Sequence, residues 1–144
     1  MSGAKAALFY PTWPKMNGEW VPSPIVDINM WNVNNFVQYD ATLFLPALIQ
    51  FVHRSTAYLL IVIVLYFVYT LYKHPIQKRL NTGIWMLITV LITQVCLGVA
   101  TVVSSVGVIP VGLGVLHQAG GLAMLSAMLF VNYQLMKAPA VRAV

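Results

Sequence analysis

Charged side chains are scarce in this sequence, since Asp, Glu, Lys and Arg together supply only 8% of its 144 residues. Soluble domains carry about 25% charged residues. With 60% hydrophobic residues and a mean hydropathy of +0.80, the composition is instead typical of an integral membrane protein. Acidic residues are the scarcest, and the three present are Glu19, Asp27 and Asp40. Because all three precede the long apolar runs, proton relay by Asp or Glu inside a membrane span is not expected.

Several common features are missing as well. The single cysteine, Cys96, excludes an internal disulfide and indicates no redox compartment. No Gly-rich phosphate loop and no nucleophilic triad pattern is present. Residues 1–7 lack the continuous apolar core of a signal peptide. The net charge of +5 comes from a few basic residues whose positions follow membrane topology, so nucleic-acid binding is not expected.

The sequence does contain three apolar runs, over residues 46–72, 81–103 and 110–136. Each has the 20 or so residues that a hydrocarbon core about 30 Å thick requires. We therefore predict an all-α integral membrane protein with three transmembrane helices in a bundle over residues 46–137.

The segment before the first run, residues 1–45, is predicted to be a long interfacial loop that could hold a short helix or turn. Its prolines interrupt any long helix, and its tryptophans are amphipathic rings of the kind that sit at a headgroup boundary. These residues are Pro11, Pro14, Pro22, Pro24, Trp13, Trp20 and Trp31. Residues 138–144 are predicted to be a short tail.

The basic residues predict how the bundle is oriented. Lys and Arg concentrate on the inner side of a membrane. The connection at 73–79 and the C-terminal end carry no acid and hold five of the basic residues, Lys73, Lys78, Arg79, Lys137 and Arg142. We expect both to face the inside of a bacterial cytoplasmic membrane or a mitochondrial inner membrane, with residues 1–45 outside. The first and third helices then both run from outside to inside.

Two histidines stand at matching places in the first and third runs. Pro46 precedes His53 by seven residues, and Pro110 precedes His117 by the same number. Proline is tolerated in a helix's first turn. If each proline begins its helix, both imidazoles lie about 10 Å along, at about 1.5 Å per residue.

An ionisable residue inside a membrane generally marks function, and two imidazoles at matched depth favour a bis-histidine haem site. Gly114, Gly120 and Gly121 share a helix face with His117 and would leave room for a flat ligand. Two alternatives stay open. The histidines could bond across helices while the glycines allow close packing, or they could bind a metal other than haem, for which no third ligand is evident.

Arg54 follows His53 and is rotated from it by about 100° around the helix. Its guanidinium suits a carboxylate, which would make Arg54 a partner for a haem propionate. The alternative is that its long side chain reaches outward to the lipid headgroups.

Four segments of the chain resemble the haem A synthase family: Tyr10–Pro22, Gln50–Arg54, Thr93–Gly98 and His117–Gly120. That family has eight membrane helices in two similar four-helix halves, each with a paired-histidine haem site. It oxidises the C8 methyl of haem O to the formyl of haem A for cytochrome oxidase. The resemblance is to the C-terminal half without its first helix. It implies that the three spans form most of a four-helix haem-binding bundle.

The resemblance implies roles for only a few residues. His53 and His117 match the haem-ligand positions of the second half, which implies a haem b whose iron both ligate. Gln50 stands where the other half carries a glutamate. No catalytic residue is therefore expected in this chain, and activity of the chain alone is not expected.

The resemblance also implies partners: membrane lipid, the missing N-terminal half or another membrane subunit, haem O in the complete enzyme, and haem O synthase as a further candidate. The alternative function is a non-enzymatic cytochrome b-type anchor subunit of a respiratory complex, which three spans and two histidines also fit. The segments Tyr10–Pro22 and Thr93–Gly98 favour the haem A synthase interpretation.

Overall fold

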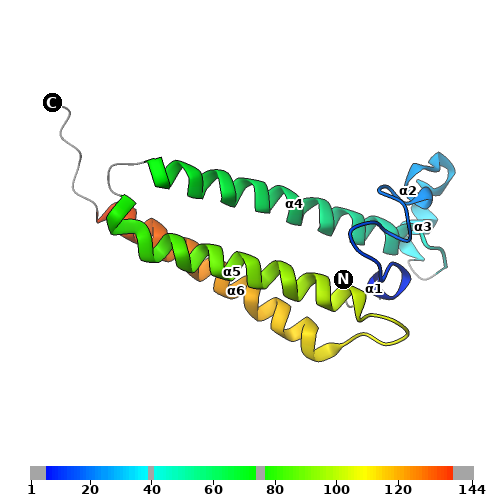
Figure 1. The fold of residues 1–144 in the computed structure, drawn as a ribbon. Coiled ribbons are helices and arrows are strands. Elements are labelled where there is room, and N and C mark those ends of the chain that lie inside the picture. The colour runs from blue at the N-terminus through cyan, green and yellow to red at the C-terminus, as the bar shows by residue number, and fades with distance from the viewer. Residues whose placement is uncertain (1–5, 39–40, 74–76, 138–144) are drawn as a thin grey trace.

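Three long helices dominate the computed structural model, which describes residues 6–38, 41–73 and 77–137. They are α4 (Phe44–Lys73), α5 (Gln77–Val103) and α6 (Val111–Met136). Each is long and apolar enough to cross a membrane. In Figure 1, α5 runs opposite to α4 and α6. The prediction of an all-α membrane protein with three spanning helices is confirmed.

The helix ends differ from the predicted bounds of the apolar runs. α4 begins at Phe44, so Pro46 is its third residue, a position whose backbone N–H needs no partner within the helix. Pro110 is the N-cap of α6 and precedes its first residue. α5 begins at Gln77, four residues before the predicted start, because a polar first turn can extend beyond the apolar part of a helix. The predicted tail, residues 138–144, lies outside the described residues.

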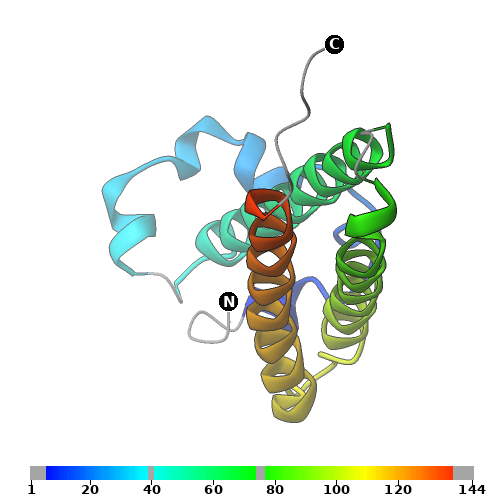
Figure 2. The same cartoon turned by 90° about the vertical axis from the view of Figure 1, so that its left-hand side faces the viewer.

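A nonpolar core joins the three helices where α4 ends and α5 begins. Figures 1 and 2 show α5 and α6 side by side, with α4 as the third member of the bundle. The fully buried Leu80, Ile84 and Leu87 of α5 form the centre of this core. The other buried members are Val64, Val68, Leu71, Leu91, Ala127 and Val131. We call this region the core end of the bundle.

The segment before α4 contains several short helices and a turn. It contains α1 (Ala6–Phe9), α2 (Ser23–Val26), the 3-10 helix η1 (Ile28–Met30) and α3 (Val33–Val37). Between α1 and α2, Met16 and Glu19 exchange backbone hydrogen bonds of 2.8 and 3.1 Å around an Asn17-Gly18 turn in which both residues have positive φ. Asn-Gly favours this turn because both residues tolerate the left-handed region.

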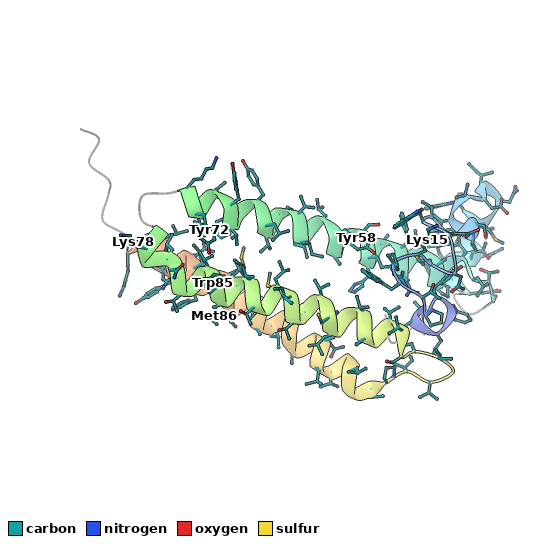
Figure 3. All side chains as sticks on the ribbon, in the orientation of Figure 1. Lys15, Tyr58, Tyr72, Lys78, Trp85 and Met86 are labelled. Carbon is teal, nitrogen blue, oxygen red and sulfur yellow. The ribbon has the colours of Figure 1, made fainter. Side chains whose placement is uncertain are left out.

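This folded segment packs on the first turns of α4. Phe44 is fully buried, and its ring meets Trp31 at 5.1 Å and Phe36 at 5.3 Å between centroids, both nearly edge to face. A second small cluster joins Tyr10, Met16 and Ala47. Figure 3 shows Lys15 of this segment at one end of the helices and Lys78 at the other. The two histidines lie toward the end that holds Lys15, which we call the histidine end.

Candidate functional site

The structure brings His53 of α4 and His117 of α6 together. Their ring centroids are 6.2 Å apart and their planes meet at 73°. The pairing follows from the fold, because α4 and α6 run in the same direction and each histidine lies within the first three turns of its helix. The predicted juxtaposition of the two imidazoles is therefore present, although neither proline is the first residue of its helix.

The spacing fits two imidazoles that share one metal ion. A metal–imidazole bond of about 2.0–2.1 Å on each side, with each nitrogen about 1.1 Å from its ring centre, separates two centroids by a little over 6 Å. Both ring planes contain the bond direction in such an arrangement, so the rings are free to differ by 73°. Within residues 6–38, 41–73 and 77–137 there is no cluster of three or more His, Cys, Asp or Glu side chains that could hold a metal, so no third such side chain joins this histidine pair.

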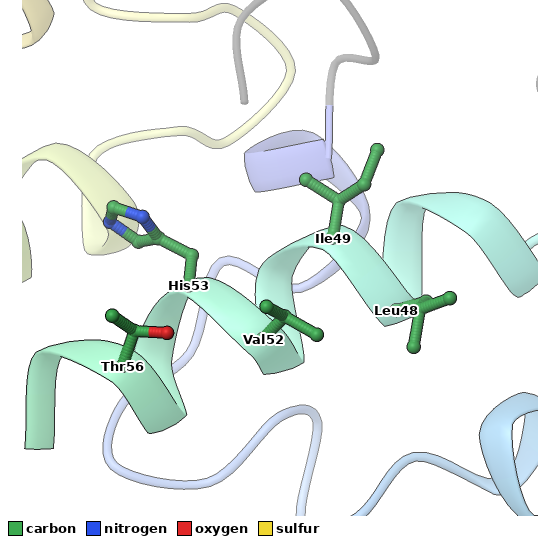
Figure 4. A pocket seen from close by; sticks show the side chains of 5 residues that line it. All are labelled: Leu48, Ile49, Val52, His53 and Thr56. Carbon is green, nitrogen blue, oxygen red and sulfur yellow. The ribbon is translucent and has the colours of Figure 1, made fainter. Parts of the chain in front are cut away.

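An open pocket of about 510 Å³ lies beside His53. Figure 4 shows the imidazole projecting from α4 into this region, with Thr56 one turn further along. The remaining lining residues are apolar: Leu48, Ile49 and Val52. All five lining residues belong to α4, so the pocket is an open hollow along one face of that helix and does not by itself mark a cofactor site.

His117 is held against α5. A Cβ atom added at Gly98 of α5 would lie 3.0 Å from Cε1 of the His117 ring and 3.4 Å from its Nδ1. This Nδ1 is buried and has no hydrogen-bond partner among the described residues. Gln94, one turn before Gly98, donates from Nε2 to the His117 carbonyl oxygen at 3.0 Å.

The sequence suggested that the three glycines near His117 leave room for a flat ligand. In the structure, not all of them do. A Cβ atom at Gly120 would collide with Oε1 of Gln94, so this glycine allows α5 and α6 to approach. One at Gly121 would stand 3.7 Å from the Gln94 amide nitrogen, and one at Gly114 would meet nothing within 4 Å. Helix packing therefore accounts for Gly120, and open space remains at Gly114.

Arg54 faces the N-terminal segment. Its Nη2 donates to the carbonyl oxygens of Tyr10 at 3.0 Å and Thr12 at 2.8 Å, and its Nη1 donates to those of Pro14 at 3.3 Å and Lys15 at 3.4 Å. Neither predicted role of Arg54, a propionate contact or a headgroup contact, included these backbone partners. The propionate contact stays a prediction.

Gln50, one turn before Arg54, shares this task. It is fully buried, and its Nε2 donates to the same Tyr10 carbonyl at 3.0 Å. We call Gln50 and Arg54, with the carbonyl oxygens they contact in residues 10–15, the carbonyl clamp. Burial, and secondarily the Glu19 carboxylate, raise the pKa of the Tyr10 phenol, so that side chain stays neutral at neutral pH.

Sequence reasoning missed the part played by Gln94 and Gly98. The two stand four residues apart, on one face of a helix, and both belong to the segment Thr93–Gly98 singled out above. That spacing was the available signal. The spacing could not show that this face of α5 meets His117. The rotation of α5 about its axis is set by packing along the whole α5–α6 pair.

Comparison with known proteins gives consistent matches along the chain. A family model for COX15-CtaA, described as a cytochrome oxidase assembly protein, matches residues 1–129. The chain is 33% identical over 132 residues to a protein named heme A synthase from Paracoccus denitrificans, which covers 90% of the chain and 31% of that relative. It is 31% identical over 141 residues to heme A synthase COX15 from Bos taurus, covering 96% and 31%.

A third relative, named heme A synthase from Sinorhizobium medicae, is 34% identical over 128 residues, covering 87% of the chain and 31% of the relative. The chain thus spans about a third of the length of these relatives. No solved structure matches the chain significantly.

Proposed function

Because the chain belongs to the COX15-CtaA family of cytochrome oxidase assembly proteins, we propose that it is the haem-binding C-terminal half of a haem A synthase. In this proposal His53 and His117 hold a haem b between α4 and α6. The observation that carries it is the 6.2 Å between the two ring centroids, on helices that otherwise present mainly apolar side chains.

The chain's own residues would bind and orient the group. The imidazoles approach from two helices, and the pocket beside His53 supplies an apolar wall. When bound between His53 and His117, a haem would supply one-electron transfer. The proposed task of this half is therefore electron transfer to, or structural support of, a second site on another four-helix unit.

Conversion of haem O to haem A is proposed to need that other unit. A positioned acid or base assists proton transfer in such chemistry. No Asp or Glu follows residue 40 in the sequence, and an amide such as that of Gln50 does not exchange protons as a carboxylate does. Gln50 is moreover committed to the carbonyl clamp.

The test is to produce the chain in membranes supplied with haem O, with and without the remaining part of a haem A synthase, and to measure haem A by chromatography. We expect a low-spin haem spectrum from the chain and haem A only when the other part is present. Haem A formed by the chain alone would overturn the division of labour. A bound haem with no haem A in either arm would favour the cytochrome b-type anchor.

We further propose that the histidine end faces the outside of a bacterial cytoplasmic or mitochondrial inner membrane. Support comes from the exposed Lys73, Lys78 and Lys137, which lie at the ends of α4 and α6 and the start of α5 at the core end, as expected of an inner surface. Lipid, the remaining part of the synthase, haem O and haem O synthase are the proposed partners.

A further inference from the structure

We propose that Gln94 and Gly98 of α5 are positioning residues that set the place and tilt of the His117 imidazole, an inference that rests on the proposed haem ligation. We call these two residues the His117 seat. Neither would touch a bound haem by this proposal. Each acts through His117, by its contact with the ring or with the backbone carbonyl of that residue.

The first part of the seat is the space left at Gly98. The nearest atom to an added Cβ would be His117 Cε1 at 3.0 Å, closer than the roughly 3.5–4.0 Å at which carbon atoms attract. An alanine at this position would therefore push the ring away from α5. A displacement of the ring changes its position relative to the His53 imidazole, whose centroid lies 6.2 Å away.

The second part is the hydrogen bond from Gln94. Its amide nitrogen reaches the His117 carbonyl at 3.0 Å while its Oε1 lies over Gly120. The opposite amide orientation would set two oxygens against each other, so the carbonyl fixes the assignment. The bond ties the backbone of His117 to α5, and Gly120 provides the notch that admits the Gln94 side chain.

No described residue orients the His117 ring through a hydrogen bond to Nδ1. A metal-ligating histidine generally donates its second ring N–H to a partner that fixes the ring. Here Nδ1 is buried without a partner in the described part of the chain, and a Cβ atom at Gly98 would also lie 3.7 Å from Nε2. Orientation then depends on packing over Gly98 and on the anchored backbone.

The experiment is a titration of the detergent-purified chain with ferric haem b, comparing wild type with Gly98→Ala, Gln94→Leu, Gly83→Ala and His117→Ala. Haem affinity and the low-spin electron paramagnetic resonance signal are measured, and circular dichroism reports helix content. Changes around a metal ligand typically cost about 10- to 100-fold in affinity, which we expect for Gly98→Ala together with a shifted signal. For Gln94→Leu we expect a loss of about three- to tenfold, as for one interhelical hydrogen bond in a membrane.

Gly83→Ala is the matched control. Gly83 also lies on α5 and faces α6, where an added Cβ would meet Gln134 and Val131, but it is about 22 Å from Gly98 along the helix. We expect its haem affinity to stay within about twofold of wild type. An equal loss in Gly83→Ala and Gly98→Ala would overturn the seat in favour of general helix packing.

Two further outcomes separate this inference from the proposed function. The first outcome is that Gly98→Ala and Gln94→Leu both keep the wild-type haem affinity and signal, while His117→Ala has no low-spin haem. It would overturn the role of the His117 seat but leave the proposed haem ligation in place. No low-spin haem in the wild type, or an unchanged signal in His117→Ala, would overturn the ligation as well. If Gly98→Ala loses its helix content, the affinity and signal of Gln94→Leu test the seat instead. This variant adds no atom to the space between α5 and α6.

Discussion

The core end and the histidine end of the bundle are built in different ways. At the core end, α4, α5 and α6 share one nonpolar cluster that includes Val68, Leu80 and Val131. At the histidine end, α4 is held by the N-terminal segment through the carbonyl clamp, and it meets α6 through two imidazoles. Apolar packing fixes the helices relative to one another, while the other end keeps polar groups and space for a ligand.

The two histidines are themselves held differently. His117 rests on α5 over Gly98, whereas His53 is exposed and its helix is fixed by Gln50 and Arg54 on the neighbouring face. One ligand is therefore positioned by a helix–helix contact and the other by a folded segment outside the span. A substitution that weakens either support should therefore disturb the histidine pair, in one case through His117 and in the other through His53.

The largest effect on haem binding is expected from substitution of the two histidines, which the core end does not have. His53→Ala and His117→Ala should each abolish the low-spin haem spectrum, because each removes one of the two imidazoles proposed to hold the haem. Helix content should remain, because the core end is untouched. Gln118→Ala, an exposed neighbour of His117, is the control and should keep its haem. Full haem content in both histidine variants would contradict the ligand assignment.

An all-or-none labelling test would show which end faces outward. In a Cys96→Ser background, a cysteine introduced as Thr12→Cys at the histidine end should react with a membrane-impermeant thiol reagent added outside intact cells. One introduced as Lys78→Cys at the core end should react only after the membrane is permeabilised, because basic segments stay on the inner side. The reverse pattern would invert the proposed topology.

Sequence reasoning predicted the spans better than the ends and contacts of the helices. Apolar runs of about 20 residues report burial in lipid directly, and the three helices are present. The start of α5 at Gln77 was not predicted, because hydropathy does not distinguish a polar helical turn from a loop. The hydrogen-bond partners of Arg54 were not predicted either. They are backbone carbonyls about 40 residues away in sequence, and no residue pattern marks them.

A partial effect is expected from the carbonyl clamp. Arg54→Ala removes four donated hydrogen bonds to residues 10–15, and a hydrogen bond to a charged group contributes about 1.5–3 kcal/mol. The segment should become susceptible to limited proteolysis, and haem affinity should fall several-fold as α4 loses its support. Arg54→Lys keeps the charge but not the planar fork of donors, and should fall between wild type and alanine.

Equal protease resistance in wild type and Arg54→Ala would show that the segment is held by the Phe44 and Met16 clusters alone. Haem affinity measured on the same samples separates the two roles. If the segment loosens while affinity stays at the wild-type value, Arg54 supports the segment without positioning His53.

The smallest effect is expected at Gln50, although its side chain is fully buried. Gln50→Leu removes one hydrogen bond to the Tyr10 carbonyl, but Arg54 continues to donate to that oxygen. The change also removes Oε1, which is buried without a partner among the described residues and costs free energy on that account. The two terms oppose each other, so the free energy of unfolding should change by no more than about 1 kcal/mol.

Gln50→Glu is the sharper comparison, because it keeps the shape and changes the chemistry. A carboxylate cannot donate to the Tyr10 carbonyl, and it would stand one turn from Arg54, where i, i+4 pairs attract. It should therefore draw the guanidinium off residues 10–15 and increase proteolysis more than Gln50→Leu does. If Gln50→Leu loosened the segment as much as Arg54→Ala, Arg54 would not be the main support of the clamp.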